Sequence, residues 1–300
     1  MDIHRNIPYT QGPSPNPFQE FDLYVPPNEH GLRPLICFVH GGAWRSYANF
    51  SSSLDHQITE YSTFLREDKE DHAILAERLA RYTGFPITVP NYRLTPQDET
   101  EDNVLRHPSH AEDILHFLEF LVSWNGPSGC GRVYDSEQMF LMGHSCSAHM
   151  LSCILLDSSA VTPSLTPSAA LLSAIKGIVL SEGIYDLDLL NAHFPEYLSW
   201  FVAPAFGKLD SYAALAVTSY SPRRLGFDWL LIHSMGDTLV DLPQSEGMVQ
   251  HLISEYGPGA GGRISLDTSL TQDHDDILVT GDFVNLVGRF VQGVLEKADA

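Results

Sequence analysis

The sequence contains no long uninterrupted run of apolar residues. A membrane-spanning helix needs roughly 18 of them in succession, and Lys176 interrupts the stretch that comes nearest. Residues 1–10 also lack the apolar segment of a secretory signal peptide. These two absences predict a chain that does not cross a membrane, is not secreted and acts in the cytoplasm.

Basic residues are scarce. The 300 residues include 17 Lys and Arg against 38 Asp and Glu, which gives a formal net charge of −21 at pH 7. A surface of this charge repels nucleic acids and anionic membranes, so we exclude both classes of partner. The same charge disfavours anionic ligands and leaves neutral or zwitterionic small molecules as the expected substrates.

Cysteine is also rare, and its spacing is not that of a metal site. The four residues are Cys37, Cys130, Cys146 and Cys153. In a chain without a secretory signal, such cysteines are typical of free thiols in a reducing compartment. We therefore predict neither disulfides nor a structural metal.

Short apolar segments alternate with amphipathic ones along the chain. The apolar segments have the length and flanks of buried strands, and the amphipathic ones have the period of helices. The alternation predicts an α/β fold with a mostly parallel, doubly wound central sheet and helices on both faces. We expect strands at 21–25, 35–39, 86–91, 139–142, 178–180, 229–232 and 264–266, and helices at 72–83, 113–124, 147–156 and 283–295.

The chain shows no internal repeat and no second core. With 43% hydrophobic residues it can bury one large core, so we predict a single domain over residues 1–300. Residues 46–71 are polar, with scattered aromatic residues and no clear period, which predicts an insertion or lid near the active site. Residues 162–174 are rich in Ser, Thr, Pro and Ala and are expected to form a surface loop.

A serine lies at the junction of a predicted strand and a predicted helix. The apolar run 139–142 ends at Gly143, and Ser145 follows two positions later, with a helix expected from Ser147. This layout is typical of a nucleophile elbow, whose sharp turn requires small neighbours around the serine. The fifth position of the motif is usually glycine, and here it is Ser147.

Two glycines follow another predicted strand. The segment 35–39 leads directly into His40, Gly41 and Gly42. Backbone amides that no side chain covers can bind an oxygen that becomes negative during acyl transfer. The residue after the elbow serine, Cys146, normally turns its side chain away and offers its own amide to the same oxygen. We therefore predict an oxyanion hole formed by the amides of Gly41, Gly42 and Cys146.

A serine nucleophile needs a base and an acid that orients it. In this type of fold the order is Ser, then Asp or Glu, then His, each after a strand. Asp237 follows the strand 229–232, with Asp241 as a lesser candidate, and His274 is the only histidine after the strand 264–266. The predicted triad is Ser145, Asp237 and His274. The free imidazole as base predicts activity that rises near about pH 6 to 7.

Other roles for these residues are less favoured. The run Asp273, His274, Asp275 and Asp276 suggests a metal site, but adjacent side chains cannot all turn to one ion, and we predict no metal. His144 is expected to be a turn residue that lines the pocket rather than a second base.

These motifs together resemble the α/β-hydrolase superfamily, over residues 21–295. The block His-Gly-Gly-Ala-Trp that begins at His40 is similar to that of its esterase and lipase branch. The segments 181–187 (Ser-Glu-Gly-Ile-Tyr-Asp-Leu) and 233–237, with Gln244 following, resemble kynurenine formamidases (arylformamidases) of the fungal type. Residues 46–71 depart from that pattern, which leaves the choice of substrate in doubt.

The resemblance implies cleavage of the formamide of N-formyl-L-kynurenine to kynurenine and formate, through a formyl-enzyme intermediate and without a cofactor. It assigns nucleophile, orienting acid and base to Ser145, Asp237 and His274, and the oxyanion hole to Gly41, Gly42 and Cys146. The anthranoyl ring of this substrate requires aromatic walls. The candidates for substrate contacts are Trp44, His144, Tyr185 and Tyr47.

Several alternatives stay open from the sequence. A general short-chain carboxylesterase of the His-Gly-Gly type would use the same triad, and a non-catalytic ligand receptor could share the scaffold. Trp44 could stack on the substrate, which we favour slightly, or support the oxyanion loop from behind. A homodimer is a further option that the sequence does not decide.

Overall fold

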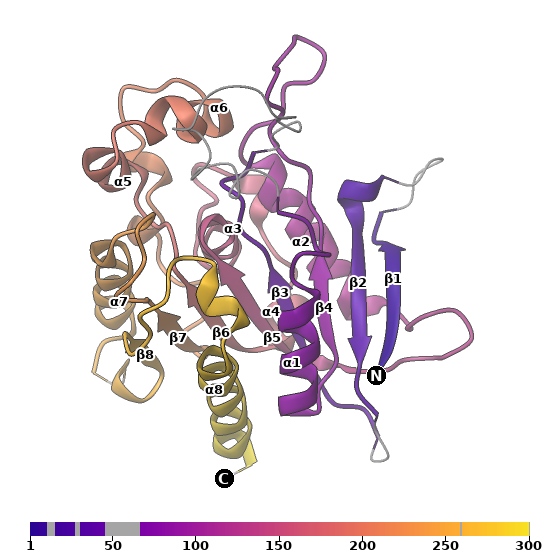
Figure 1. Ribbon diagram of the computed structural model, residues 1–300. Helices are drawn as coiled ribbons and strands as arrows, with labels where there is room; N and C mark the ends of the chain where they lie inside the picture. The colour runs from indigo at the N-terminus through magenta and orange to yellow at the C-terminus, as the bar shows by residue number, and fades with distance from the viewer. Residues whose placement is uncertain (11–15, 28–30, 46–66, 259, 300) are drawn as a thin grey trace.

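The computed structural model describes residues 1–10, 16–27, 31–45, 67–258 and 260–299 (Figure 1). Its centre is an eight-stranded sheet in the order β1-β2-β4-β3-β5-β6-β7-β8, in which β1, β2 and β4 pair antiparallel and all later pairs are parallel. The strands are β1 (Asp2–Pro8), β2 (Glu20–Val25), β3 (Pro34–Val39), β4 (Ile87–Pro90), β5 (Asp135–His144), β6 (Ile175–Ser181), β7 (Asp228–Ile232) and β8 (Ile264–Asp267).

Helices cover both faces of the sheet. On one face lie α1 (Ala73–Thr83) and α8 (Gly281–Asp299), side by side in Figure 1. Phe283, Val287 and Val291 recur every four residues along α8, so one stripe of that helix is buried. The other face packs against α2 (Ser109–Ser123), α3 (Cys146–Leu155) and α7 (Leu242–Tyr256).

The predicted α/β fold is confirmed, and the predicted strands and helices all occur with small shifts of their ends. The expected loop at 162–174 is wrong in its second half, because Ala169–Ala174 forms the short helix α4, whose first turn is capped by the Ser168 hydroxyl. Strand β1 and helix α7 were not predicted from the sequence. The predicted insertion at 46–71 lies mostly outside the described residues, which resume at Glu67.

The topology decides where a site can form. The parallel strands β3, β5, β6, β7 and β8 all end at the same edge of the sheet, and the loops that follow them meet there. Beyond this edge lie α5 (Leu187–His193), the π-helix η4 (Leu198–Val202) and α6 (Ala203–Phe206), of which α5 and α6 are labelled in Figure 1. Among the helices that the structure describes, none has the length and apolar character to cross a membrane.

Candidate active site

The turn between β5 and α3 holds Ser145 in a strained conformation. Ser145 has φ 55° and ψ −121°, a region that a residue with a side chain rarely adopts. Its amide donates to the carbonyl of Ser181 at the end of β6 (2.9 Å), which fixes the turn against the neighbouring strand. A Cβ at Gly143 would lie 3.0 Å from both the carbonyl oxygen of Ser147 and Leu151 Cδ1, so only glycine fits there without displacing α3.

The departure from the usual motif has a structural role. The Ser147 hydroxyl accepts a hydrogen bond from the amide of His144 (2.7 Å) and lies 2.7 Å from the carbonyl oxygen of Val39, to which it can donate. Val39 is the last residue of β3 and His144 the last residue of β5. Ser147 therefore connects the end of the strand before the glycine loop to the serine turn.

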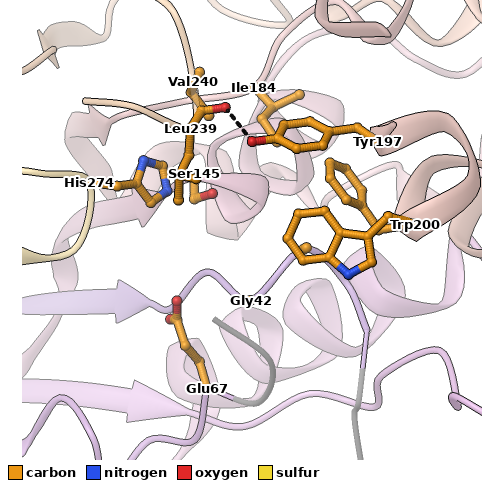
Figure 2. Close-up of a pocket in the computed structure, with 11 residues that line it drawn as sticks. Gly42, Glu67, Ser145, Ile184, Tyr197, Trp200, Leu239, Val240 and His274 are labelled. Atoms are coloured by element: carbon orange, nitrogen blue, oxygen red, sulfur yellow. Dashed lines mark hydrogen bonds between the residues drawn. The ribbon is translucent and has the colours of Figure 1, made fainter. Parts of the chain in front are cut away.

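The structure brings Asp237 and His274 together. Asp237 Oδ2 lies 2.7 Å from His274 Nδ1, and its Oδ1 accepts from the amides of Leu239 and Val240 (2.8 and 3.0 Å). His274 and Ser145 line the same pocket (Figure 2). Asp241, the lesser candidate, instead pairs with His193, 48 residues before it in sequence.

Electrostatics link this pair to a third acid, Glu182. Burial, followed by the interaction with Asp237, raises the pKa of the Glu182 carboxyl to about 10, so it is protonated at neutral pH. Its Oε1 accepts from the amide of Ser234 (2.8 Å). Burial also disfavours the charged forms of His274 and Asp237, but each charged group stabilises the other. The pKa of His274 is therefore raised to about 9, and the pKa of Asp237 lies well below its usual range.

Glu182 received no predicted role, although it lies in the segment 181–187 that resembles the formamidases. A signal was available. Glu182 directly follows β6, and β6 pairs with β7, the strand before Asp237. Acids that follow neighbouring parallel strands come close at one edge of the sheet.

The glycine loop differs from the prediction. The Gly41 amide donates to Glu67 Oε2 (2.7 Å), so in this structure it is engaged by a carboxylate instead of being open to an oxyanion. Gly42 and Ala43 line the pocket, and Ala43 was not predicted. Cys146 is the first residue of α3, where an amide has no carbonyl partner within its own helix.

One wall of the pocket comes from the segment after β6. The pocket has an empty volume of about 370 Å³, which includes the solvent-filled space at its opening. An aromatic wall of Tyr197, Trp200 and Phe201 forms one side, and the Tyr197 hydroxyl donates to the carbonyl of Leu239 (3.2 Å). The sequence analysis did not predict these three residues as substrate contacts. The described lining is Gly42, Ala43, Glu67, Ser145, Ile184, Tyr197, Trp200, Phe201, Leu239, Val240 and His274.

Trp44 does not lie among these lining residues, so its predicted stacking on substrate has no support in the geometry. Its ring is fully buried and packs edge-on against Phe206 (centroids 4.9 Å apart) and His149 (5.6 Å). Trp44 follows Gly41 and Gly42 with only Ala43 between, has φ 58°, and its ring lies in the core. The second alternative, support of the loop, is the one that its position favours.

His144 and Tyr185 are also absent from the described pocket wall. Both are fully buried. His144 bridges the Ser181 hydroxyl and Asp275 Oδ1 (both 3.0 Å), and its ring lies 4.7 Å from that of His274. The backbone amide of Tyr185 donates to Gln244 Oε1 (2.8 Å). These two residues support the site from behind, and Tyr47 lies outside the described residues.

The Cys146 thiol points away from the pocket, toward the Tyr92 hydroxyl (3.6 Å). Burial raises its pKa to about 12, so the thiol remains protonated at neutral pH. A protonated, buried thiol is a poor nucleophile, which agrees with the choice of Ser145.

Three clusters in the described part of the chain place metal-ligand atoms within 4.8 Å of one another. In each of them a carboxylate oxygen lies 2.7–3.0 Å from an imidazole nitrogen, which accounts for the proximity without an ion. The absence of a metal remains a prediction. The clusters are His40, Glu67 and His72; His144, His274 and Asp275; and Glu182, Asp237 and His274.

The chain is similar to known hydrolases, although no family model matches it. The kynurenine formamidase of Meyerozyma guilliermondii is 29% identical over 239 residues, which cover 77% of this chain and 76% of that protein. A probable isoprenylcysteine α-carbonyl methylesterase of Oryza sativa subsp. japonica is 29% identical over 196 residues, which cover 64% of this chain but only 39% of that protein.

Solved structures show the same fold. Esterase B of Lactobacillus rhamnosis has a TM-score of 0.72 at 15% identity, with 99% of this chain and 88% of that one covered. At 15% identity this likeness concerns the fold alone, whereas the sequence identity to the formamidase is 29%. The chain therefore has the fold of this esterase and is similar in sequence to a kynurenine formamidase over about three quarters of both chains.

Proposed function

We propose that the chain is a kynurenine formamidase that cleaves N-formyl-L-kynurenine to kynurenine and formate. The observation that carries the proposal is the arrangement of three side chains: Ser145 and His274 line one pocket, and His274 Nδ1 lies 2.7 Å from Asp237. The similarity to a formamidase over three quarters of both chains supports a formamide as the bond that is cleaved.

The mechanism is a two-step acyl transfer. Ser145 attacks the formyl carbon while His274 takes the hydroxyl proton. The amides of Gly42 and Cys146 bind the oxyanion, and each such donor lowers the barrier by about 3 kcal/mol. The C–N bond then breaks as His274 gives its proton to the leaving arylamine. Water, activated by His274, releases formate from the formyl-serine, and no step requires a cofactor.

A short-chain carboxylesterase is the second candidate, because a methylesterase is among the sequence relatives and an esterase among the similar structures. A receptor without activity receives no support, since the relatives reported above are enzymes. The single domain over residues 1–300, the cytoplasmic location and a homodimer stay predictions of the sequence.

The test is a comparison of kcat/KM for N-formyl-L-kynurenine with kcat/KM for p-nitrophenyl acetate and butyrate. We expect the formamide to exceed both esters by about two orders of magnitude, because a specific site binds the whole transition state. The Ser145→Ala variant serves as the control for background hydrolysis. Equal or higher values for the esters would assign the chain to the carboxylesterases.

A further inference from the structure

Glu67 places a carboxylate in the pocket that Ser145 and His274 line (Figure 2). Its side chain is only 12% exposed. A Cβ built at Gly41 would lie 3.1 Å from both Glu67 Oε1 and Ser145 Cβ. The carboxylate and the serine therefore flank the same glycine, and a substrate at Ser145 lies next to Glu67.

One carboxylate oxygen of Glu67 is fixed and the other is open. Oε2 accepts from the Gly41 amide (2.7 Å) and lies 3.0 Å from His72 Nε2 and 3.8 Å from His40 Nδ1. Oε1 has no hydrogen-bond partner among the residues that the structure describes. Three contacts to one oxygen hold the group in a defined orientation and leave the second oxygen for a ligand.

The carboxylate is negative at neutral pH. Burial opposes its charge, but the hydrogen bond from His72 and the electrostatic contacts with His72 and His40 outweigh burial and lower the pKa of Glu67 to about 2. A charge in a mostly apolar pocket is costly unless an opposite charge or a hydrogen-bond donor faces it. Gly41 and His72 meet this need at Oε2. The aliphatic side chains that line the pocket offer neither to Oε1; they are Ile184, Leu239 and Val240.

The aromatic wall adds a second attraction for a cation. The rings of Tyr197, Trp200 and Phe201 lie within 5.3 Å of one another, centroid to centroid. Figure 2 shows Tyr197 and Trp200 on one side of the pocket and Glu67 on another. The face of an aromatic ring attracts an ammonium group. Carboxylate and rings together are the two features by which proteins bind organic cations.

We infer that Glu67 and the aromatic wall form a subsite for a positively charged group, an ammonium carried by the substrate close to the acyl group that Ser145 attacks. The inference rests on the proposed function and deepens it, since N-formyl-L-kynurenine carries an ammonium. It also extends to esters and amides that carry the same charge. The subsite would give a cationic substrate an advantage over a neutral one of the same shape.

The test uses a matched pair of esters, 4-(aminomethyl)phenyl acetate and its neutral isostere 4-ethylphenyl acetate. The measured quantity is the ratio of their kcat/KM values. In Glu67→Gln the amide oxygen can keep the contacts to Gly41 and His72, but the charge is lost. We expect the ratio to fall about tenfold, as is typical for removal of a charge-assisted hydrogen bond. Because both substrates are esters, the result does not depend on formamidase activity.

Glu70→Gln is the control, since it removes the same charge from a side chain that is 67% exposed and outside the pocket. The ratio should stay at its wild-type value in this variant. An unchanged ratio in Glu67→Gln, or an equal fall in both variants, would overturn the inference.

A measurement on the wild-type enzyme avoids any effect of the variants on folding. Benzylammonium should inhibit ester hydrolysis competitively at about tenfold lower concentration than benzyl alcohol, which has the same ring without the charge. Equal inhibition by the two compounds would contradict a cation subsite. If the cation subsite holds but N-formyl-L-kynurenine is not cleaved, the proposed function fails and the inference stands.

Discussion

At the scale of single residues, the site depends on side chains in backbone conformations that cost energy. Ala43, Trp44, Ser145 and Glu182 have φ values between 48° and 58°, and none of them is glycine. Each such conformation costs about 1–3 kcal/mol and persists only where contacts with the surrounding structure hold it. Bonds between strand ends supply this support, as when the amide of Glu182 donates to the carbonyl of Ile232 (3.0 Å). Strain of this kind is typical of active sites, where it positions reactive groups.

The first prediction concerns the acid that orients His274. Asp237→Asn should lower kcat by about 10⁴, because the amide favours the wrong tautomer of the imidazole. Asp241→Asn, which removes only the partner of His193, should change kcat less than about threefold. Steady-state kinetics on both variants would check the assignment. A larger loss in the Asp241 variant would move the orienting role to that residue.

Glu182 allows a test by isosteric replacement. A glutamine is neutral at pH 7, as the protonated acid is, and its amide can donate a proton toward Asp237, so Glu182→Gln should keep kcat/KM within a few-fold at pH 7. Glu182→Ala removes that donor and should lower kcat/KM by about tenfold or more. Rates for both variants, with melting temperatures to separate activity from folding, check the prediction. Equal losses would show that the volume of the side chain matters and its proton does not.

At the scale of elements, the loop after β3 depends on a buried ring. Trp44→Ala should lower the free energy of unfolding by about 3–5 kcal/mol, because it opens a cavity beside Phe206 and His149. The oxyanion loop should loosen as well, so formamide and ester substrates should lose rate in the same proportion. Thermal denaturation and kcat/KM for both substrates would check this. A selective loss for the aromatic formamide, at unchanged stability, would restore the stacking role.

The elements that the sequence predicted are those with a local signal. Buried strands such as 229–232 are short apolar runs, and helices such as 113–124 carry an apolar face, so both can be predicted without tertiary information. The candidate triad was predictable for the same reason, since its members follow strands in a set order. Tyr197, Trp200 and Phe201 carry no local signal of this kind, because their place in the pocket depends on how the segment after β6 folds over the sheet edge.

Two site residues needed the tertiary structure. The Gly41 amide looked open because the sequence does not show that Glu67, 26 residues away, returns to it. Trp44 looked like a pocket residue because it follows the glycines with only Ala43 between, whereas its ring is buried in the core against Phe206. The sequence motifs thus indicated which loops form the candidate site, but they did not predict which side chains line the pocket.

At the scale of the whole molecule, negative charge sets the conditions of activity. The chain carries a net charge of −21, and carboxylates near His274 include Asp237, Asp275 and Glu67. Burial opposes the imidazolium, but these carboxylates outweigh burial and raise the pKa of His274 to about 9. This raised pKa favours a transition at higher pH than the range of about 6 to 7 expected for an unperturbed imidazole.

The pH dependence follows from the sign of this shift. His274 must be neutral to act as base, so a raised pKa moves the onset of activity to higher pH. We predict that kcat/KM rises from pH 7 to beyond pH 9, and that the transition lies at lower pH in the residual activity of Asp237→Asn, which lacks the main carboxylate. A pH profile of kcat/KM, taken where chemistry limits the rate, checks both. A transition near pH 6.5 in the wild-type enzyme would contradict the electrostatic account.

The most direct test of the central claim is covalent labelling of the serine in competition with the substrate. A fluorophosphonate probe is added with increasing N-formyl-L-kynurenine, and the labelled peptide is identified by mass spectrometry. The account predicts an adduct on Ser145, formed more slowly as the substrate concentration rises, and no adduct in Ser145→Ala. A label on another residue, or a rate of labelling that N-formyl-L-kynurenine does not change, would contradict it.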